Sequence, residues 1–517
     1  MIMKTFCLLI IQLTFLNTVL LAQIYPLDST FGDSGKTIVD ITSVNIAQNH
    51  IATQIDGKII LATSKVKYNN GYDFDFCLLR FNTDGTLDNS FGSQGMILCD
   101  LGSTEDLAFD VAIQSDDKIL VVGTSGGFTD RDFALVRLNA DGTNDQSFGN
   151  NGIVKTSILY DDELYSVALQ TDGKIVAGGI GNSKGYIFRF LDDGSLDNSF
   201  GSNGKVSLQY GGITMVRDIT IMDDGSILVA GQIGGNNADG FVAKLNSNGS
   251  PNTSFGTNGK YIVNFSNQEY INTLSCQSDG KILLGGAYGY MMGSNPTVEF
   301  LIVRLLPEGI LDNSFNNSGK ITFGFDPNFA FNECNTIKLN ANDDIFAIGY
   351  TINSQLTNSY FAIAKLTVNG SLDLTFGNNG KVISDFGSSK EKGQGAIIDN
   401  YERLLVSGIY GDSTNPIICR YKTSISTNIS EQLQRSSIIN IFPNPCKDYI
   451  SIDFLSIPEK VIDITLYDIS GKEIHKFTPI SNYWQTITIP TDFLTYGIYQ
   501  MKINLGNTLL SKILIKK

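Results

Sequence analysis

The chain has 517 residues, of which 42% are hydrophobic and 17% charged, with 52 glycines and a net charge of −15. Many glycines and few charges favour short strands and tight turns over long helices. The negative charge argues against nucleic acid as a partner, because phosphate contacts need a basic surface. The length exceeds what one hydrophobic core usually supports, so we expect several domains or a repeat assembly.

The first 22 residues have the pattern of a secretory signal peptide. Lys4 precedes the apolar run 6–11, and a second apolar run ends in the small residue Ala22. A basic start, an apolar run and a small residue before the cleavage point are the three parts of such a signal. Elsewhere no segment approaches the roughly 18 apolar residues that a membrane-spanning helix needs. We therefore predict an exported protein without a transmembrane segment.

A short phrase, Leu-Asp-Asn-Ser-Phe-Gly at residues 87–92, recurs along most of the chain. Its seven versions are centred on Phe31, Phe91, Phe148, Phe200, Phe255, Phe315 and Phe376. The steps between them range from 52 residues (148 to 200) to 61 residues (315 to 376). A period of this size is typical of repeat architectures such as propellers and solenoids.

Each period contains four runs of strand-like residues. In the second unit they are 111–114, 118–123, 133–138 and 152–156, which we call strands A to D. The A–B connection usually carries Asp-Gly, as at Asp56-Gly57, which suits a two-residue hairpin. Strand B usually ends in glycine, as at Gly123, which suggests close approach of another backbone or an unusual backbone conformation. Four antiparallel strands in succession make a meander, the unit of one propeller blade.

The two ends of the repeat region complement each other. Residues 35–40 look like a D strand with no blade before it, whereas 403–406 and 417–421 look like B and C strands with no D strand after them. Pairing these pieces removes two exposed sheet edges. We therefore predict an all-β fold in which residues 23–422 form a seven-bladed β-propeller of four-stranded antiparallel blades, closed by the N-terminal strand.

The composition changes after residue 422. Residues 423–437 are rich in Ser, Thr, Asn and Gln and read as a linker. Residues 438–517 show apolar alternation at period two, broken by Pro and Gly, which predicts a small Ig-like β-sandwich of about seven strands.

Both parts resemble known families. Residues 23–422 resemble the delta-60 repeat family of bacterial β-propellers through D-G-K-I-L, F-x-L-x-R and D-G-x-L-D-x-S-F-G, which recur in that order. Residues 438–517 are similar to the type A sorting domain of the type IX secretion system of Bacteroidetes, through F-P-N-P, L-Y-D-I-S-G-K, G-I-Y and a basic end. The second resemblance implies the type IX machinery as a partner, export across the outer membrane, removal of the domain, and surface attachment or release.

The sequence offers little catalytic chemistry. Its two histidines are His50 and His475, and there is no G-x-S-x-G elbow, so we assign no catalytic residue. The six cysteines outside the signal peptide lack metal-ligand spacing, so we predict no metal site. Disulfides are open in an exported chain, and the sequence assigns no pairing. The carboxylates of the C–D turns either cap their own turns through hydrogen bonds to the backbone or bind calcium, and we favour capping. These carboxylates are Asp84, Asp88, Asp141, Asp145, Asp193 and Asp197.

Function is expected where the repeats differ, on the face that carries the B–C and D–A loops. The candidate ligand-binding residues in these loops are Tyr68, Asp130, Arg131, Tyr288, Tyr290 and Asn353. One position near the start of strand A is mostly polar and is expected to ring the channel mouth; it is occupied by His50, Asp110, Ser166, Asp218, Thr273, Thr336 and Gly395. Solvated loops around a water-filled channel are the alternative without function.

Two functions fit these features. The first is a secreted or cell-surface binding module for a glycan or protein ligand, without a cofactor, because Tyr and Asn suit sugar stacking and hydrogen bonding. The second is a carbohydrate-active enzyme, a polysaccharide lyase or hydrolase, that uses carboxylates and Tyr on the same face.

Overall fold

The computed structural model describes residues 27–41, 48–68, 72–127, 129–159, 161–234, 238–290, 297–423, 439–442, 446–454, 463–468, 472–477, 486–504 and 509–516. The chain divides into two compact units, Met1–Thr423 and Ser424–Lys517. The predicted signal peptide and all but the first residue of the predicted linker lie outside the described residues. The described residues contain no α-helix, and one short 3-10 turn at Phe315–Asn317 interrupts the strands. The all-β prediction is confirmed.

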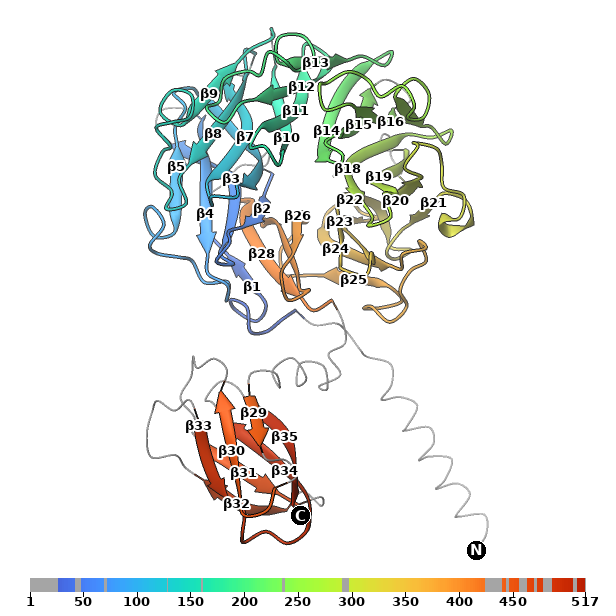
Figure 1. Cartoon of the computed structure of the whole chain (residues 1–517). Coiled ribbons are helices and arrows are strands. Elements are labelled where there is room, and N and C mark those ends of the chain that lie inside the picture. The colour runs from blue at the N-terminus through green and yellow to red at the C-terminus, as the bar shows by residue number, and fades with distance from the viewer. Residues whose placement is uncertain are drawn as a thin grey trace, which may run out of the picture. The chain divides into compact units, whose positions relative to one another are not determined.

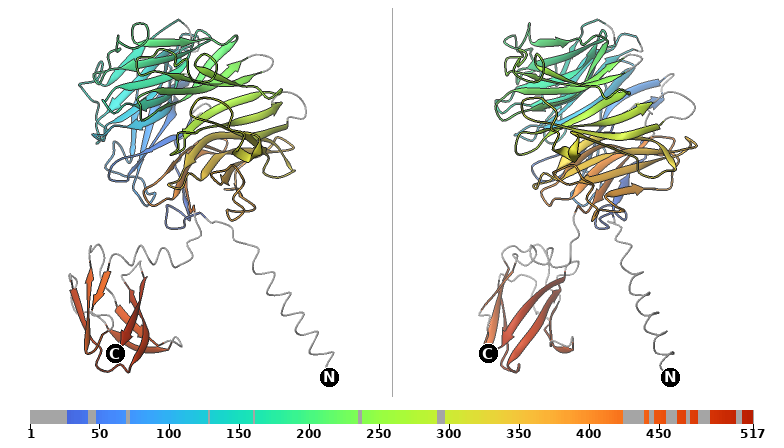
Figure 2. Two further views of the ribbon diagram at one scale, coloured as in Figure 1. Left: turned by 45° about the vertical axis from the view of Figure 1, so that its right-hand side comes forward. Right: turned by 90° about the vertical axis from the view of Figure 1, so that its right-hand side faces the viewer.

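The first unit is a ring of antiparallel sheets, seen along its axis in Figure 1 and from the side in Figure 2. Its described strands form three sheets of four strands and two sheets of eight. Each eight-stranded sheet divides into two antiparallel groups of four, which are joined by one parallel bridge, Phe74 to Glu105 or Val298 to Phe331. In chain order the first three groups are β2 (His50–Thr53), β3 (Ile59–Tyr68), β4 (Tyr72–Phe81) and β5 (Met96–Cys99); β6 (Glu105–Ile113), β7 (Ile119–Gly126), β8 (Asp132–Leu138) and β9 (Ile153–Thr156); and β10 (Glu163–Leu169), β11 (Ile175–Gly181), β12 (Lys184–Phe190) and β13 (Lys205–Leu208).

The next three groups continue the same pattern. They are β14 (Ile213–Ile221), β15 (Ile227–Gly234), β16 (Asp239–Leu245) and β17 (Lys260–Val263); β18 (Glu269–Cys276), β19 (Ile282–Tyr290), β20 (Thr297–Leu305) and β21 (Lys320–Phe323); and β22 (Phe329–Leu339), β23 (Ile345–Asn353), β24 (Ser359–Leu366) and β25 (Lys381–Ser384). The last group holds β26 (Glu391–Ile398), β27 (Leu404–Tyr410), β28 (Asn415–Tyr421) and β1 (Lys36–Ile38).

The first strand of each group lies nearest the centre of the ring, as the labels β2, β10, β14, β18, β22 and β26 show in Figure 1. We call these strands, together with β6, the inner strands. Apolar clusters fill the space between neighbouring sheets. One of them joins Phe76 and Phe91 of the first group to Val121 of the second. Another joins Leu405 and Ile418 of the last group to residues of the first. The core is therefore divided among the interfaces between sheets.

Strand β1 completes the last group from the other end of the chain. It pairs antiparallel with β28 in the register Lys36 to Cys419, Thr37 to Ile418 and Ile38 to Ile417. This is the pairing beside residues 417–421 that the closed-ring model requires. The edge of β28 is covered as a result, which removes a site for pairing with other chains.

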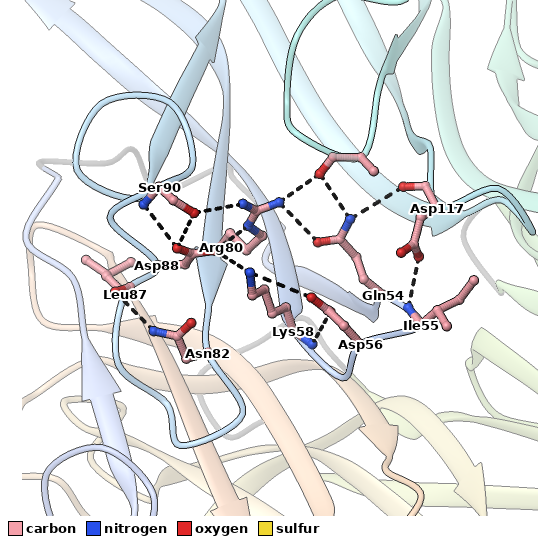
Figure 3. A network of polar contacts seen from close by, with 11 residues as sticks. Gln54, Ile55, Asp56, Lys58, Arg80, Asn82, Leu87, Asp88, Ser90 and Asp117 are labelled. Carbon is pink, nitrogen blue, oxygen red and sulfur yellow. Dashed lines mark hydrogen bonds and ion pairs between the residues drawn. The ribbon is translucent and has the colours of Figure 1, made fainter.

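The repeated phrase joins one group to the next, as Figure 3 shows for Arg80 on β4. The Arg80 Nε atom donates to Asp88 Oδ2 at 2.8 Å, and Ser90 donates to Asp88 Oδ1 through both its N–H and its hydroxyl. The guanidinium also lies over the Phe91 ring, 4.3 Å from its centroid. It reaches into the next group, where it donates to the Ala140 carbonyl at 2.7 Å.

The Phe91 ring fits against a glycine in the turn of that next group. A Cβ atom built on Gly142, which has a φ of 91°, would lie 2.7 Å from the ring. The same contacts occur where the last group meets the first, since Arg420 also donates to the Thr83 carbonyl at 2.7 Å. There Arg420 Nε donates to Asp28 at 2.8 Å, and the Arg420 guanidinium lies 4.6 Å from the Phe31 centroid. The phrase is therefore an interface element between groups.

The second unit consists of two sheets around one core. The described strands are β29 (Ile439–Phe442), β30 (Tyr449–Phe454), β31 (Asp463–Tyr467), β32 (Glu473–Phe477), β33 (Thr486–Pro490), β34 (Gly497–Asn504) and β35 (Leu509–Lys516). One sheet has the order β29-β30-β33 and the other β32-β31-β34-β35. Ile450 and Ile489 from the first sheet share a buried cluster with Leu466, Met501 and Leu514 from the second.

Replacing Phe91 with alanine should destabilise the ring by about 3–5 kcal/mol, because a fully buried aromatic side chain leaves a cavity between two groups. Urea unfolding of the wild type and of Phe91→Ala measures this loss. Ile55→Ala removes an apolar side chain that is 74% exposed and serves as the control. A loss as small as that of the control would contradict the interface role of Phe91.

Acid should weaken the interfaces. Burial opposes the shift, but hydrogen bonds from Ser147 and the charges of Arg137 and Lys118 outweigh it and lower the pKa of Asp145 to about 2. A carboxyl with a lowered pKa in the folded state adds stability above its unfolded pKa of about 4, and loses it as the pH falls towards the folded pKa.

Asp145→Asn should therefore be less stable than the wild type at pH 7, and its stability should fall less between pH 4 and pH 2. Urea midpoints measured across this pH range test the difference. Parallel curves for the two proteins would show that Asp145 does not carry this dependence.

Candidate functional site

The candidate site is a polar cavity among the inner strands, with a volume of about 230 Å³. All seven positions predicted to ring the channel line it, namely His50, Asp110, Ser166, Asp218, Thr273, Thr336 and Gly395. A second cavity of about 160 Å³ shares residues with it, including His50, Tyr165, Arg217, Asn272 and Asn335. The structure thus brings together residues that are up to 345 positions apart in sequence.

A β-bulge occurs just before the predicted position in six of the inner strands. In β14, for example, Val216 pairs with Gly231 and Asp218 with Ala230, so Arg217 is the extra residue. A bulge leaves one residue outside the ladder and redirects its side chain. The six extra residues are Phe109, Tyr165, Arg217, Asn272, Asn335 and Gln394. Five of them, all except Phe109, line the second cavity.

The sequence analysis missed these bulge residues, although it contained a signal for them. The glycine that ends strand B lies opposite the bulge, and a Cβ on Gly231 would lie 1.9 Å from the Met215 carbonyl oxygen. The same holds for Gly123 against Leu107. The backbone of the bulged inner strand is therefore the close neighbour that this glycine accommodates, as the sequence analysis suggested in general terms.

Four of the polar residues after the bulges form a hydrogen bond from one inner strand to the next. Asp110 Oδ2 accepts the Val167 N–H at 2.9 Å, and Asp218 Oδ2 accepts the Leu274 N–H at 2.8 Å. Ser166 and Thr273 accept backbone N–H groups of the following strand in the same way. Burial raises the pKa of Asp218, against the opposing effects of the Leu274 N–H and the Lys338 charge.

His50 is the one histidine in the cavity, and its Nδ1 atom lies 3.0 Å from Asp110 Oδ1. The His50 side chain is 29% exposed. The contact with Asp110 holds the Nδ1 side of the ring in place.

The bulge residues form two unlike halves. In one half, the rings of Phe109 and Tyr165 are 5.3 Å apart, and the Arg217 guanidinium lies 4.4 Å from the Tyr165 centroid. The other half consists of amides. Asn272 donates to the Cys334 carbonyl at 3.1 Å and Asn335 to the Gly393 carbonyl at 2.7 Å. The cavity therefore has an aromatic and cationic side and an amide side.

The structure places the predicted loop residues on separate hairpins, and none of them lines either cavity. Tyr290 is 57% exposed at the end of β19, whereas Tyr288 lies under the Lys320 ammonium, 5.1 Å away. Tyr68 ends β3 and pairs with Tyr72, and its side chain lies outside the described residues.

Three of the predicted loop residues hold local structure. Asp130 accepts the Gly127 N–H at 3.0 Å, and Asn353 accepts the Thr357 N–H at 2.9 Å, so each closes its own loop. Arg131 links β6 to β10, because it donates to Glu105 at 2.9 Å and to Glu163 at 2.6 Å.

The carboxylates of the C–D turns have protein partners. Asp84 accepts the Thr86 N–H and hydroxyl at 2.9 and 2.7 Å, and Asp141 and Asp193 do the same with Thr143 and Ser195. These are the turn-capping contacts that the sequence analysis favoured over calcium.

Among the described residues, one group of acidic side chains is close enough to share a metal ion, with oxygens of Asp75, Asp100 and Asp106 within 4.8 Å of one another. The Lys67 ammonium already pairs with Asp75 and Asp100 there. The six described cysteines are free thiols.

Two family models match the chain. The model of a β-propeller domain of unknown function, DUF5122, matches six segments, which are residues 54–91, 114–148, 170–200, 223–255, 277–315 and 341–376. The model of the secretion system C-terminal sorting domain matches residues 440–517. The chain carries β-propeller repeats and a secretion sorting domain. Both resemblances drawn from the sequence are thereby confirmed, and the first unit is called the propeller from here on.

The sorting domain places the protein at the cell surface or in the medium, after export by the type IX system and cleavage of this domain. No helix among the described residues has both the length and the apolar character needed to cross a membrane. No curated protein matches the sequence.

The chain is similar to several solved structures at low identity and with TM-scores below 0.5. The polysaccharide lyase Uly1 is 12% identical over 74% of this chain and 91% of its own, with a TM-score of 0.40. An α-L-arabinanase of Penicillium chrysogenum, complexed with arabinobiose, is 10% identical over 75% and 97%, with a TM-score of 0.41. A protein of unknown function from Dyadobacter fermentans is 10% identical over 75% and 97%, with a TM-score of 0.36.

Removing the carboxylate at Asp110 should destabilise the propeller. Asp110→Ala leaves the Val167 N–H without its acceptor, which costs about 1–3 kcal/mol, whereas Asp110→Asn keeps an oxygen that can accept it. Thermal and urea unfolding of both variants test this role. Equal losses in the two variants would show that the acceptor at this position is not what stabilises the fold.

Proposed function

We propose that the protein is an exported binding module that holds an extracellular glycan at the mouth of the propeller channel. The observation that carries the proposal is the set of β-bulges, which direct Tyr165, Arg217, Asn272, Asn335 and Gln394 from five inner strands into one cavity. An aromatic ring beside amide groups suits a sugar, whose ring has apolar faces and whose hydroxyls both donate and accept hydrogen bonds.

The size of the cavity favours a glycan over a protein ligand. Its volume of about 230 Å³ lies below the roughly 300–1,000 Å³ of pockets for drug-sized ligands, so it suits a single sugar unit of a longer chain. The predicted loop residues lie on hairpins of the face that carries the channel mouth. They are the exposed Tyr290 and Tyr68, Asp130, Arg131, Tyr288 and Asn353. Neighbouring units of the glycan would contact these hairpins.

The proposal includes the finer architecture. The seven groups of strands are seven blades, the N-terminal strand closes the propeller over residues 23–422, and the second unit is an Ig-like sandwich. Residues 1–22 are the signal peptide, 423–437 the linker and 438–517 the part that the type IX machinery recognises.

A glycan array with the full exported chain tests the proposal. His50→Ala removes a cavity side chain and should reduce binding to the best glycans by about tenfold or more, roughly the effect of one good polar contact. Tyr290→Ala, on a hairpin, should change binding less, and melting temperatures show whether each variant is folded.

Three results would contradict the channel mouth as the binding site. These are array binding that is absent for the wild type, binding unchanged by His50→Ala, and binding abolished by Tyr290→Ala alone. The last result would transfer the site to the hairpins.

An enzyme acting on a polysaccharide is the second candidate, favoured by the His50–Asp110 contact in the same cavity. A histidine held by a carboxylate is a common general base. The aspartates themselves are poor candidates, because Asp110 and Asp218 already accept backbone N–H groups. Release of oligosaccharides from a polysaccharide by the wild type, lost in His50→Ala, would favour the enzyme over the binding module.

A further inference from the structure

The described arginines of the propeller form ion pairs with carboxylates, with one exception. Seven of the eight described arginines pair with a carboxylate, and these are Arg80, Arg131, Arg137, Arg189, Arg304, Arg403 and Arg420. Arg217 makes no such pair within the part of the chain that the structure describes. In a chain with a net charge of −15, an arginine without an acidic partner is an exception that requires a reason.

Arg217 lies in the proposed binding cavity, because the bulge in β14 turns it out of the ladder. Its guanidinium is held over the Tyr165 ring at 4.4 Å. The Nε atom is buried and has no hydrogen-bond acceptor among the described residues. A buried donor without an acceptor is unfavourable, and the guanidinium fork matches the two oxygens of a carboxylate or sulfate.

The acidic groups around the cavity are already engaged. Asp110 and Asp218 accept backbone N–H groups of the next inner strand, and Glu333 accepts the Tyr350 hydroxyl at 2.7 Å. Asn272 donates to the other Glu333 oxygen at 2.9 Å. Lys338 is a second cation on the wall of the larger cavity. The guanidinium of Arg217 thus remains for a group that comes from outside.

We propose that Arg217 binds an oxyanion of an acidic glycan, either the carboxylate of a uronic acid or a sulfate ester. The inference rests on the proposed function and specifies its ligand class. The contact is a single bidentate pair between the guanidinium and the oxyanion inside a cavity, not a basic surface patch. It therefore selects an acidic sugar unit at one position of the glycan. Tyr165 beneath the guanidinium fixes its orientation before the ligand arrives.

Calorimetric titration of the full exported protein with matched oligosaccharides tests the inference. The probes are an oligogalacturonate and its neutral methyl ester, and a sulfated galactan oligosaccharide and its desulfated form. One acidic probe should bind the wild type about tenfold or more tightly than its neutral partner, and which pair does so identifies the oxyanion. Arg217→Gln should remove this preference, so that the acidic probe binds no more tightly than its neutral partner.

Two further variants sharpen the test. Arg217→Lys keeps the charge but lacks the fork, and should lose most of the preference. Lys338→Gln removes the other cation of the cavity wall and should lower the preference for the acidic probe much less than Arg217→Gln does. The inference is overturned if Arg217→Gln retains the preference, or if Lys338→Gln abolishes it while Arg217→Gln does not.

The outcomes also separate this inference from the proposed function. Neutral probes that bind the wild type, weaken with His50→Ala and match their acidic partners in affinity would overturn the acidic ligand and leave the glycan-binding site in place. Failure of every probe and of the glycan array would overturn both.

Discussion

The propeller depends on one contact that is repeated between its blades, the arginine that pairs with an aspartate, covers a phenylalanine and reaches the next blade. It occurs with Arg80, Arg137, Arg189 and Arg304, and once more with Arg420 across the closure. Each of these arginines has buried charge and needs all its partners, since removing one partner of a buried pair is costly. The contact therefore ties neighbouring groups together at five places, and the other two groups carry Lys244 and Lys365 at the same position.

Much of this architecture could be predicted because its signals are local. The turn residues, the period and the phrase around Phe91 lie within single repeats, and the unmatched pieces at the two ends indicated the closing strand. The site was predictable only in part. Alternation at period two describes a regular strand, so the extra residue of a bulge, such as Arg217, is assigned to the wrong face.

The loop residues illustrate the other limit of sequence reasoning. Asp130 and Asn353 are of residue types that are common in binding loops, but their oxygens accept N–H groups of their own turns. Arg131 is committed to Glu105 and Glu163, which come from two other strands. Composition identifies residues that form hydrogen bonds, whereas only the tertiary structure shows which of them are already satisfied. The channel mouth shows the same difference. Asp110 and Asp218 accept backbone N–H groups and so stabilise the fold, whereas the bulge residues beside them differ in type from one repeat to the next.

The pairing of β1 with β28 has a consequence for the order in which the blades fold. Arg80 and Asp88 are 8 residues apart, whereas Arg420 and Asp28 form the same bond across 392 residues. For a flexible chain the longer loop costs about 3 kcal/mol more to close, so this bond gains little until the other blades have brought the ends together. We therefore expect the last blade to assemble after the rest, from both ends of the chain. Until then β28 has an open edge, and the docking of β1 marks the moment at which the whole repeat region is present and folded.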